Sequence, residues 1–435
     1  MSFDLPVLPQ DWSYAPLDTC SQANSVTYGV VQPGSALETG KPLIRVNNFR
    51  DTRIDLSDVM FIAPEIEAKY SRTRLKGGEV LLTIVGSVGQ VAVVPPHCAG
   101  FNVARAVAVI HPLPNIAPEW IALCLRSPLS QHLLGSRANT TVQTTINLKD
   151  LRALPIPLPP DAERRTIAEF VAALDDRITL LRDTNATLEA IAQALFKSWF
   201  VDFDPVRAKM QGRAPEGMDE TTAALFPGSF EESELGLVPR GWRVANLADS
   251  FEINPRRELA KGSIASYLDM ASLATSGHCV ETPIQREVGS GAKFRNGDTL
   301  LARITPCLEN GKSAFVDFLA DSQVGWGSTE FLVMRPKASL PEYFAYLLCR
   351  HATFREYAIQ SMVGTSGRQR IQNDVLGRYL LALPIDAIAL KFAEIVEPIQ
   401  QSIAANHQTA QTLATLRDTL IPRLISGALR LPIAV

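Results

Sequence analysis

The sequence lacks the residue patterns that disulfide frameworks, zinc sites and membrane spans require. Its six cysteines are scattered singly over 435 residues, without a CxxC pair, so we expect reduced thiols, some of them simple core residues. No run of about 18 or more apolar residues is present, which predicts no transmembrane helix. The opening "MSFDLPVLPQDW" has no basic region followed by an apolar stretch, so we expect no signal peptide. These features favour a cytoplasmic protein.

Catalytic motifs are missing as well. The chain has no GxxxxGK[ST] phosphate loop, no HExxH and no methyltransferase motif, and its six histidines form no plausible ligand set. The stretch "GSVGQ" is typical of a hairpin turn rather than a cofactor loop. The acids of "VDFDPVRAKM" lack the Glu-x-Lys of a nuclease centre. We therefore expect a non-catalytic chain with no metal and no cofactor of its own.

The numbers of acidic and basic residues are nearly equal, but these residues are unevenly distributed along the chain. The net charge is −3, which argues weakly against a nucleic-acid partner. Residues 161–237 hold eight Lys and Arg against fifteen Asp and Glu, whereas residues 238–384 hold seventeen against fourteen. The flanking blocks are thus mildly basic, and local patches there could still hold phosphates.

The chain repeats itself with a register shift of about 225 residues. "LPQDWSYAPL" with Trp12 matches "VPRGWRVANL" with Trp242, "LKGGEVLLTI" matches "FRNGDTLLAR", and "APEWIALCLRS" matches "LPEYFAYLLCR". Each copy has about 150 residues rich in Val, Ile and Leu runs with Gly and Pro, followed by a long helical pattern. A duplicated unit favours pseudo-twofold symmetry and symmetric partners, although duplication without functional meaning is the alternative.

The repeat predicts an α+β fold with two mixed, mostly β globular domains in tandem, separated by two long antiparallel coiled-coil helices related by pseudo-twofold symmetry. The expected segments are a first globular domain (1–157), a first spacer helix (158–200), an acidic linker (201–237), a second globular domain (238–384), a second spacer helix (385–427) and a C-terminal tail (428–435). Within the first domain we expect two strands around the "GSVG" turn and helical structure over 118–136.

Apolar residues recur every seven positions along both helical segments, as in a coiled-coil seam. The seam residues are Ile167, Leu174, Ile178, Leu181, Asn185, Leu188 and Leu195 in the first helix and Phe392, Ile399, Ile403, Asn406, Leu413 and Leu420 in the second. Neither helix can bury its seam alone, so we expect the two to pack together. The asparagines on the seam either fix the register or are tolerated defects.

Polar loops of the globular domains are rich in residue types that read DNA bases. Arg pairs with guanine and Asn or Gln with adenine through bidentate hydrogen bonds, and Thr contacts bases or phosphates. The candidates are Arg45, Asn47, Asn48, Arg50, Arg72, Arg74, Lys76, Arg105, Arg137, Asn139, Thr141 and Gln143 in the first domain and Arg256, Arg257, Arg303, Ser366, Arg368, Gln369 and Arg370 in the second. Any one such loop, taken alone, is more often solvated surface.

The order of these features resembles the specificity (HsdS) subunit of type I restriction–modification systems. The resemblance is most specific in "LPIPLPPDAERRTIAEFVAALDDRI" and in "LEAIAQALFKSWFVDFDPVRAKMQGRAPEGMD" followed by "ELGLVPRGW". It implies that each globular domain is a target recognition domain reading one half of a bipartite double-stranded DNA sequence. It also implies that the helices set the gap between the half-sites.

The resemblance further implies two methyltransferase subunits as partners, docked on the helices, with restriction subunits joining through the complex and no membrane partner. S-adenosylmethionine, ATP and Mg would belong to those partners. Two other readings stay open from the residues alone: a helical scaffold that binds only protein, and an enzyme with its own nuclease or methyltransferase activity.

Overall fold

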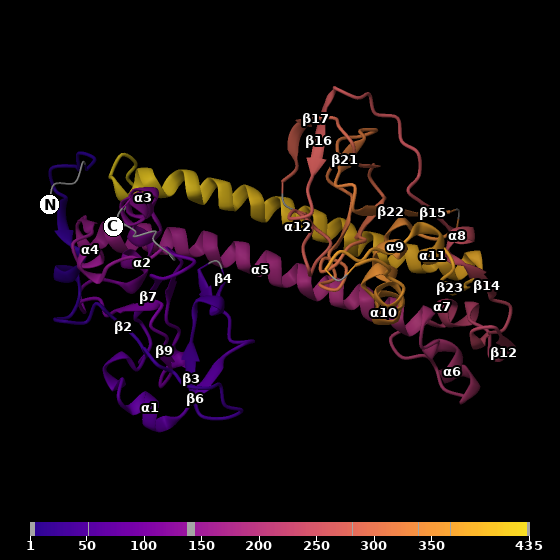
Figure 1. Ribbon diagram of the computed structural model, residues 1–435, viewed down its shortest axis with the longest axis horizontal. Helices are drawn as coiled ribbons and strands as arrows, with labels where there is room; N and C mark the ends of the chain where they lie inside the picture. Colours follow the sequence, from indigo (N-terminus) through magenta and orange to yellow (C-terminus); the bar gives the residue numbers. More distant parts are fainter. Residues whose placement is uncertain are drawn as a thin grey trace. The chain divides into compact units, whose positions relative to one another are not determined.

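A computed structural model describes residues 5–50, 52–136, 144–280, 282–337, 339–365 and 367–432. The chain forms two compact units, one of Met1–Thr179 with Gln411–Val435 and one of Leu180–Ala410. Two helices of 40 residues each, α5 (Asp161–Phe200) and α12 (Asp386–Ile425), contribute to both units (Figure 1). The units therefore do not end at the predicted segment boundaries, because each contains part of both helices.

The first unit is built on a four-stranded antiparallel sheet. Its strand order is β2 (Thr27–Tyr28), β10 (Val107–Ile110), β7 (Val80–Thr83) and β8 (Val91–Val93). A three-stranded sheet has the order β6 (Met60–Ile62), β3 (Lys41–Ile44) and β9 (Asn102–Val103), and β3 runs parallel to β9. The remaining pairs are β1 (Ser13–Pro16) with β11 (Pro155–Leu158) and β4 (Phe49–Arg50) with β5 (Arg53–Ile54). Its short helices are α1 (Pro64–Ala68), α2 (Pro118–Arg126), α3 (Pro128–Ser136) and α4 (Leu148–Arg152).

The second unit repeats this plan. Its four-stranded antiparallel sheet has the order β15 (Phe251–Ile253), β22 (Phe331–Pro336), β19 (Thr299–Ala302) and β20 (Ser313–Phe315). The second sheet has the order β17 (Ile284–Glu287), β16 (Ile264–Leu268), β21 (Gly325–Gly327) and β18 (Ala292–Phe294), and β16 runs parallel to β21. β14 (Arg243–Asn246) pairs with β23 (Leu380–Leu383), as β1 pairs with β11. Its short helices are α8 (Leu247–Ser250), α9 (Glu342–Arg350), α10 (Ala352–Gln360) and α11 (Asn373–Leu376).

The acidic stretch between the copies is folded and belongs to the second unit. It forms α6 (Asp204–Met210), α7 (Glu220–Leu225) and a hairpin of β12 (Phe230–Ser233) and β13 (Gly236–Pro239). Phe203 and Phe226 anchor it in the core of that unit. The predicted linker is therefore an ordered part of the second unit.

The repeat extends to individual hydrogen bonds. A buried acid precedes the equivalent strands β7 and β19: Glu79 accepts from the backbone N–H of Lys76 at 2.7 Å, and Asp298 accepts from that of Arg295 at 2.8 Å. In both copies this carboxylate closes the turn that leads into a central strand. The matching "KGGE" and "RNGD" of the sequence thus mark the same turn.

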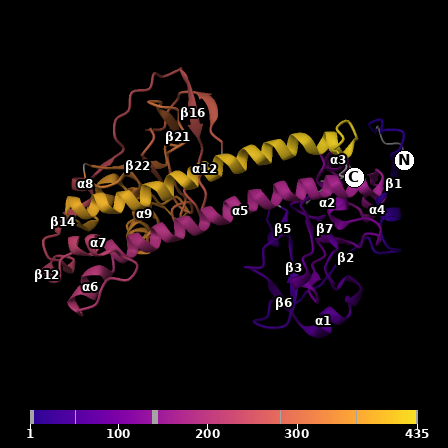
Figure 2. The same cartoon turned by 180° about the vertical axis from the view of Figure 1, so that it is seen from behind.

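The helices α5 and α12 run antiparallel within each unit and lie side by side in both views (Figure 1 and Figure 2). In the second unit Asn185 contacts Ile403 and Asn406, and in the first unit Asp175 contacts Arg417. The predicted seam residues are all buried or half-buried. The heptad pattern identified this interface because a helix buries one face only.

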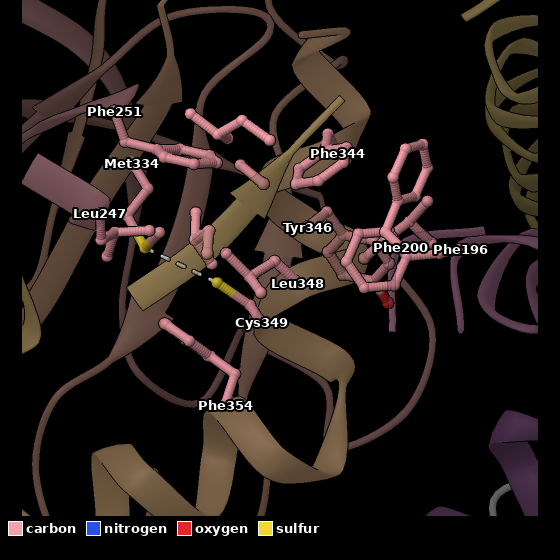
Figure 3. Close-up of a cluster of buried hydrophobic side chains, with 14 of the residues drawn as sticks. Phe196, Phe200, Leu247, Phe251, Met334, Phe344, Tyr346, Leu348, Cys349 and Phe354 are labelled. Atoms are coloured by element: carbon pink, nitrogen blue, oxygen red, sulfur yellow. Dashed lines mark hydrogen bonds between the residues drawn. The ribbon is translucent and has the colours of Figure 1, made fainter. Parts of the chain in front are cut away.

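The core of the second unit contains the end of α5. Phe196 and Phe200 pack edge-on against Phe344 of α9, with ring centroids 4.9 and 5.1 Å apart (Figure 3). Deeper in this core, the Sγ atom of Cys349 lies 3.7 Å from the Sδ atom of Met334. These aromatic contacts hold α9, and with it the globular part of the second unit, against the end of α5.

The predicted fold class is confirmed: both copies combine mostly β sheets with a few short helices, and two long helices follow them. The two strands around the "GSVG" turn are β7 and β8. The helical pattern over 118–136 is divided into α2 and α3, because Pro128 starts a new helix. None of the described helices has the length and apolar character needed to cross a membrane.

Candidate nucleic-acid interface

A cleft of about 750 Å³ with a cationic lining opens in the second unit. Its walls come from the segment before β16, from β18, and from the ends of β19 and β22. Arg256, Arg257, Lys293 and Arg303 bring four positive charges to it and Glu258 one negative charge. In a chain with a net charge of −3, this local excess of positive charge is suited to a polyanion such as the DNA backbone.

The two neighbouring arginines of the cleft differ in their surroundings. Arg257 donates from Nη2 to both carboxylate oxygens of Asp298, at 3.0 and 3.3 Å. Asp298 is fully buried and also accepts from Nε of Arg335 at 2.6 Å. Arg257 is thus fixed in the cleft wall and its charge is balanced there. Arg256 is exposed and forms no ion pair with the residues that the structure describes, so it can reach a phosphate.

Gln369 and Arg370, which end the stretch "GTSGRQR", lie directly beside the strand end that carries Arg303. The backbone N–H of Thr305 donates to the carbonyl of Gln369 at 3.0 Å, and the N–H of Ile371 donates to that of Arg303 at 3.0 Å. Arg370 forms isolated bridges with Val363 and with the residue after Arg303. The structure therefore brings together Arg303, Gln369 and Arg370, which the sequence had placed in two separate stretches.

Arg370 forms a bidentate ion pair with Glu330. Its Nε lies 3.0 and 2.9 Å from the two carboxylate oxygens, and its Nη2 lies 2.6 Å from Oε1. The hydrogen bond from Arg370, together with its positive charge, holds the pKa of Glu330 below its usual range. Glu330 is therefore ionised at neutral pH, and the pair presents an oriented guanidinium beside the cleft.

The first unit has the same backbone arrangement with different side chains. In the first unit the N–H of Ile84 donates to the carbonyl of Ala106 at 2.8 Å, and in the second the N–H of Arg303 donates to the carbonyl of Glu330 at 3.0 Å. Thr145 forms an isolated bridge with Val85, and Arg370 forms the equivalent bridge with Ile304. Ile84, Ala106 and Thr145 thus stand where the second unit has Arg303, Glu330 and Arg370. One scaffold carries two unlike sets of side chains at the same place.

The predicted residues of the segment 45–50 are paired locally, mostly with residues 55–58. Arg45 and Asn47 both donate to Oδ2 of Asp58, at 3.1 and 2.8 Å, and Arg50 pairs with Asp55 at 2.6 Å. Asn48 is 1% exposed. Its amide accepts from the N–H of Arg45 and donates to two loop carbonyls. The side chain of Asn48 therefore organises the loop from inside and presents no surface to a ligand.

The basic stretch after α1 contains one paired arginine and two exposed cations. Arg74 forms a fork with Glu67, at 2.8 and 2.6 Å, and Glu67 also accepts from Asn102 at 3.2 Å. Arg72 and Lys76, like Arg105 further along the chain, are exposed. These three cations are placed to meet a polyanion, whereas Arg74 has a structural partner.

Some predicted residues lie outside the described part of the chain, namely Arg137, Asn139, Thr141, Gln143 and Ser366. Arg368 is described and exposed. Sequence reasoning missed Lys293, Glu330 and Asp298. Of these three, only Asp298 could have been identified from the sequence, because it occupies the position of Glu79 in the repeat. Among the residues that the structure describes, no cluster of three or more His, Cys, Asp and Glu could hold a metal ion.

Comparison with known proteins gives a consistent result. Residues 35–190 match the family model described as "Type I restriction modification DNA specificity domain". The EcoBI specificity subunit of Escherichia coli is 35% identical over 170 residues, which span 39% of this chain and 36% of that subunit. The HindI specificity subunit of Haemophilus influenzae is 25% identical, with 82% of this chain and 88% of that subunit covered. The EcoKI specificity subunit of E. coli K12 is 29% identical, with 91% and 83% covered.

The fold also has a solved relative. The crystal structure of the type I restriction–modification S subunit from M. genitalium matches with a TM-score of 0.53 and 14% identity, covering 96% of this chain and 98% of that one. At this identity the likeness concerns the fold. The duplicated scaffold, the family model and the nearly full-length relatives agree that this chain is similar to the specificity subunits of type I restriction–modification systems.

Proposed function

We propose that this chain is the DNA-reading component of a type I restriction–modification complex, with each globular domain reading one half of a bipartite double-stranded target. The observation that carries the proposal is a set of three equivalent positions with unlike side chains in the two copies. Arg303, Glu330 and Arg370 in one copy replace Ile84, Ala106 and Thr145 in the other. Because base identity is read through side-chain hydrogen bonds and apolar contacts in the grooves, the two domains would read different half-sites.

The charges of the second domain support contact with the DNA backbone. Phosphate contacts supply affinity and position a protein on the duplex, while base contacts specify the sequence. The cleft with Arg256, Lys293 and Arg303 is suited to phosphate contacts, and the neighbouring Arg370 is suited to a base contact. The overall charge of −3 makes tight binding by the isolated chain unfavourable, so partner subunits would supply further phosphate contacts.

The two helices would set the distance between the half-sites. A helix of 40 residues is about 60 Å long, and half-sites on one face of DNA recur about every 34 Å. An antiparallel pair with a buried seam is stiff enough to hold such a spacing. Shortening both helices by one heptad is therefore expected to change the gap of the target.

Exposed apolar residues on the helices support docking of two equivalent partners. Ile191 of α5 is 45% exposed and Leu416 of α12 is 44% exposed. The two positions correspond in the repeat, because Asp161 and Asp386 begin the two helices. Two like apolar positions at equivalent places favour two copies of one partner, which we take to be methyltransferase subunits.

As a specificity subunit the chain is a recognition component, and catalysis would belong to its partners. The methyltransferase subunits would bind S-adenosylmethionine, and the restriction subunits, which join through the complex, would use ATP and Mg. The alternative of a helical scaffold without a DNA role predicts no dependence of DNA binding on the residues of the cleft.

A methylation map tests the proposal. The chain is co-expressed with its cognate methyltransferase subunit in a host free of DNA methylation, and modified bases are detected by sequencing the genome. A methylated two-part motif with a fixed gap is the expected result. A stable complex that leaves no mark and binds no genomic sequence selectively would contradict it.

A further inference from the structure

The Arg370–Glu330 pair leaves one edge of the guanidinium open. Arginine has five N–H groups, and Nε with one N–H of Nη2 is directed to Glu330. Among the residues that the structure describes, none accepts from Nη1 of Arg370. The Nη1–Nη2 edge therefore presents two parallel N–H groups. This is the donor arrangement that matches O6 and N7 of guanine in the major groove.

Both members of the pair are fixed by backbone contacts. Arg370 and Val363 exchange backbone hydrogen bonds of 2.9 and 3.0 Å. Glu330 receives the N–H of Arg303 on its carbonyl, and its own N–H donates to Oγ of Ser328 at 3.1 Å. The guanidinium is thus oriented before any ligand arrives, so little rotamer entropy is lost when it meets a base.

Neither stability nor phosphate binding accounts for this pair. The side chains of Arg370 and Glu330 are 40% and 23% exposed, and ion pairs that solvent can reach contribute little to stability. The carboxylate also cancels much of the attraction of Arg370 for a phosphate. Arg256, which has no carboxylate partner among the described residues, is the better phosphate anchor. What the carboxylate adds is orientation, and orientation serves base reading.

We infer that Glu330 is a positioning residue that holds Arg370 in place to read a guanine in the half-site of the second domain. The inference rests on the proposed function and deepens it. The first copy has Ala106 and Thr145 at the two positions, so the effect belongs to one half-site only.

The test compares methylated motifs of complexes that carry Glu330→Gln, Arg370→Lys or, as a matched control, Asp321→Asn. Asp321 is an exposed acid in the same domain and does not line the cleft. Glu330→Gln removes the charge that orients the fork, and Arg370→Lys keeps the positive charge but loses the fork. Each is expected to relax the preference for guanine at one position of one half-site by about ten-fold, with the other half-site unchanged. The control keeps the wild-type motif.

A scan of the unaltered complex makes the test independent of variant folding. Each guanine of the half-site that the second domain reads is replaced by 7-deazaguanine, which lacks the N7 acceptor, and binding is titrated. One guanine is expected to lose about ten-fold in affinity. If the complex with Glu330→Gln methylates the wild-type motif, the inference is wrong. If the variants leave no methylation mark at all, the scan decides, and a scan in which no guanine is sensitive overturns the inference. A stable wild-type complex that leaves no mark and binds no genomic sequence selectively would instead overturn the proposed function.

Discussion

Asn406 on α12 donates a hydrogen bond to Asn185 on α5, with 3.0 Å between Nδ2 and Oδ1. Asn185 in turn donates to the carbonyl of Ile403 at 3.0 Å. Both amides lie half-buried between apolar seam residues of the two helices. Because a slipped pairing would leave these groups without partners, the contact favours one register of the antiparallel helices.

Replacing one member of this pair is expected to cost more than replacing both. Asn185→Leu leaves the Asn406 amide without its acceptor and should lower the free energy of unfolding by about 1 kcal/mol. The double variant Asn185→Leu/Asn406→Leu should recover that loss, since two apolar residues suit the seam. Urea unfolding followed by tryptophan fluorescence measures both. Single variants as stable as the wild type would mean that the asparagines are tolerated defects.

A three-residue ion cluster fixes the helices in the first unit. Asp175 of α5 accepts from Arg417 of α12 at 2.6 Å and from Arg126 of α2 at 2.8 Å. The three side chains are only 16 to 19% exposed. Asp175→Ala removes the shared acceptor and should cost about 3 kcal/mol of unfolding free energy. Arg417→Leu should cost less, because Asp175 keeps Arg126, and the reverse order in urea unfolding would contradict this account.

The Glu67–Arg74 pair predicts a pH dependence of stability. The hydrogen bond from Arg74 lowers the pKa of Glu67, whose side chain is 1% exposed. A lowered folded-state pKa stabilises the chain above the unfolded value of about 4.3, and this contribution is lost as the pH falls through the folded-state value. Glu67→Gln should therefore be less stable than the wild type by about 1 to 3 kcal/mol at pH 7.

That difference should shrink when urea unfolding is repeated below pH 4, where Glu67 gains a proton in the unfolded chain and then in the folded one. Glu65→Gln, at an exposed position of the same helix, is the control and should show no such trend. An equal deficit of Glu67→Gln at both pH values would assign its effect to packing rather than to charge.

The long helices could be predicted closely from the sequence, whereas the ion pairs could not. The pattern from Ile167 to Leu195 repeats every seven residues, and periodicity within one segment identifies a buried helix face without any knowledge of the partner. The predicted spacer segments, 158–200 and 385–427, differ from the observed helices by at most three residues at either end. The duplicated motifs likewise identified two copies of one scaffold.

The site needed long-range contacts that one sequence does not contain. Arg370 was predicted as a base-reading residue, but its partner Glu330 lies 40 residues earlier in a stretch with no motif. Asn48 has the right chemistry for adenine, yet its amide is satisfied inside its own loop. Residue type indicates what a side chain can bind, and only the fold decides whether it faces solvent.

The apolar positions on the helices predict the stoichiometry of the complex. Ile191→Glu and Leu416→Glu each place a charge at one of the two equivalent positions, and burying an unpaired charge at an interface is costly. Each variant should lose one of two methyltransferase subunits, and the double variant both, as measured by native mass spectrometry. Ala186→Glu adds the same charge about 140° round the helix at an exposed position and should leave two subunits bound.

The exposed Arg256 of the cleft should act through charge alone. Arg256→Ala removes one phosphate contact, so the affinity of the complex should fall to a similar degree for all DNA sequences. The slope of log K against log salt should become shallower by about 0.9. Arg240→Ala removes the same charge from an exposed position that does not line the cleft and should leave the slope unchanged. Titration at several salt concentrations with specific and random duplexes separates these outcomes.

If Arg256→Ala relaxed the methylated motif at one base and left the salt slope intact, Arg256 would read a base. The division of the cleft into a phosphate anchor and a base-reading arginine would then be wrong.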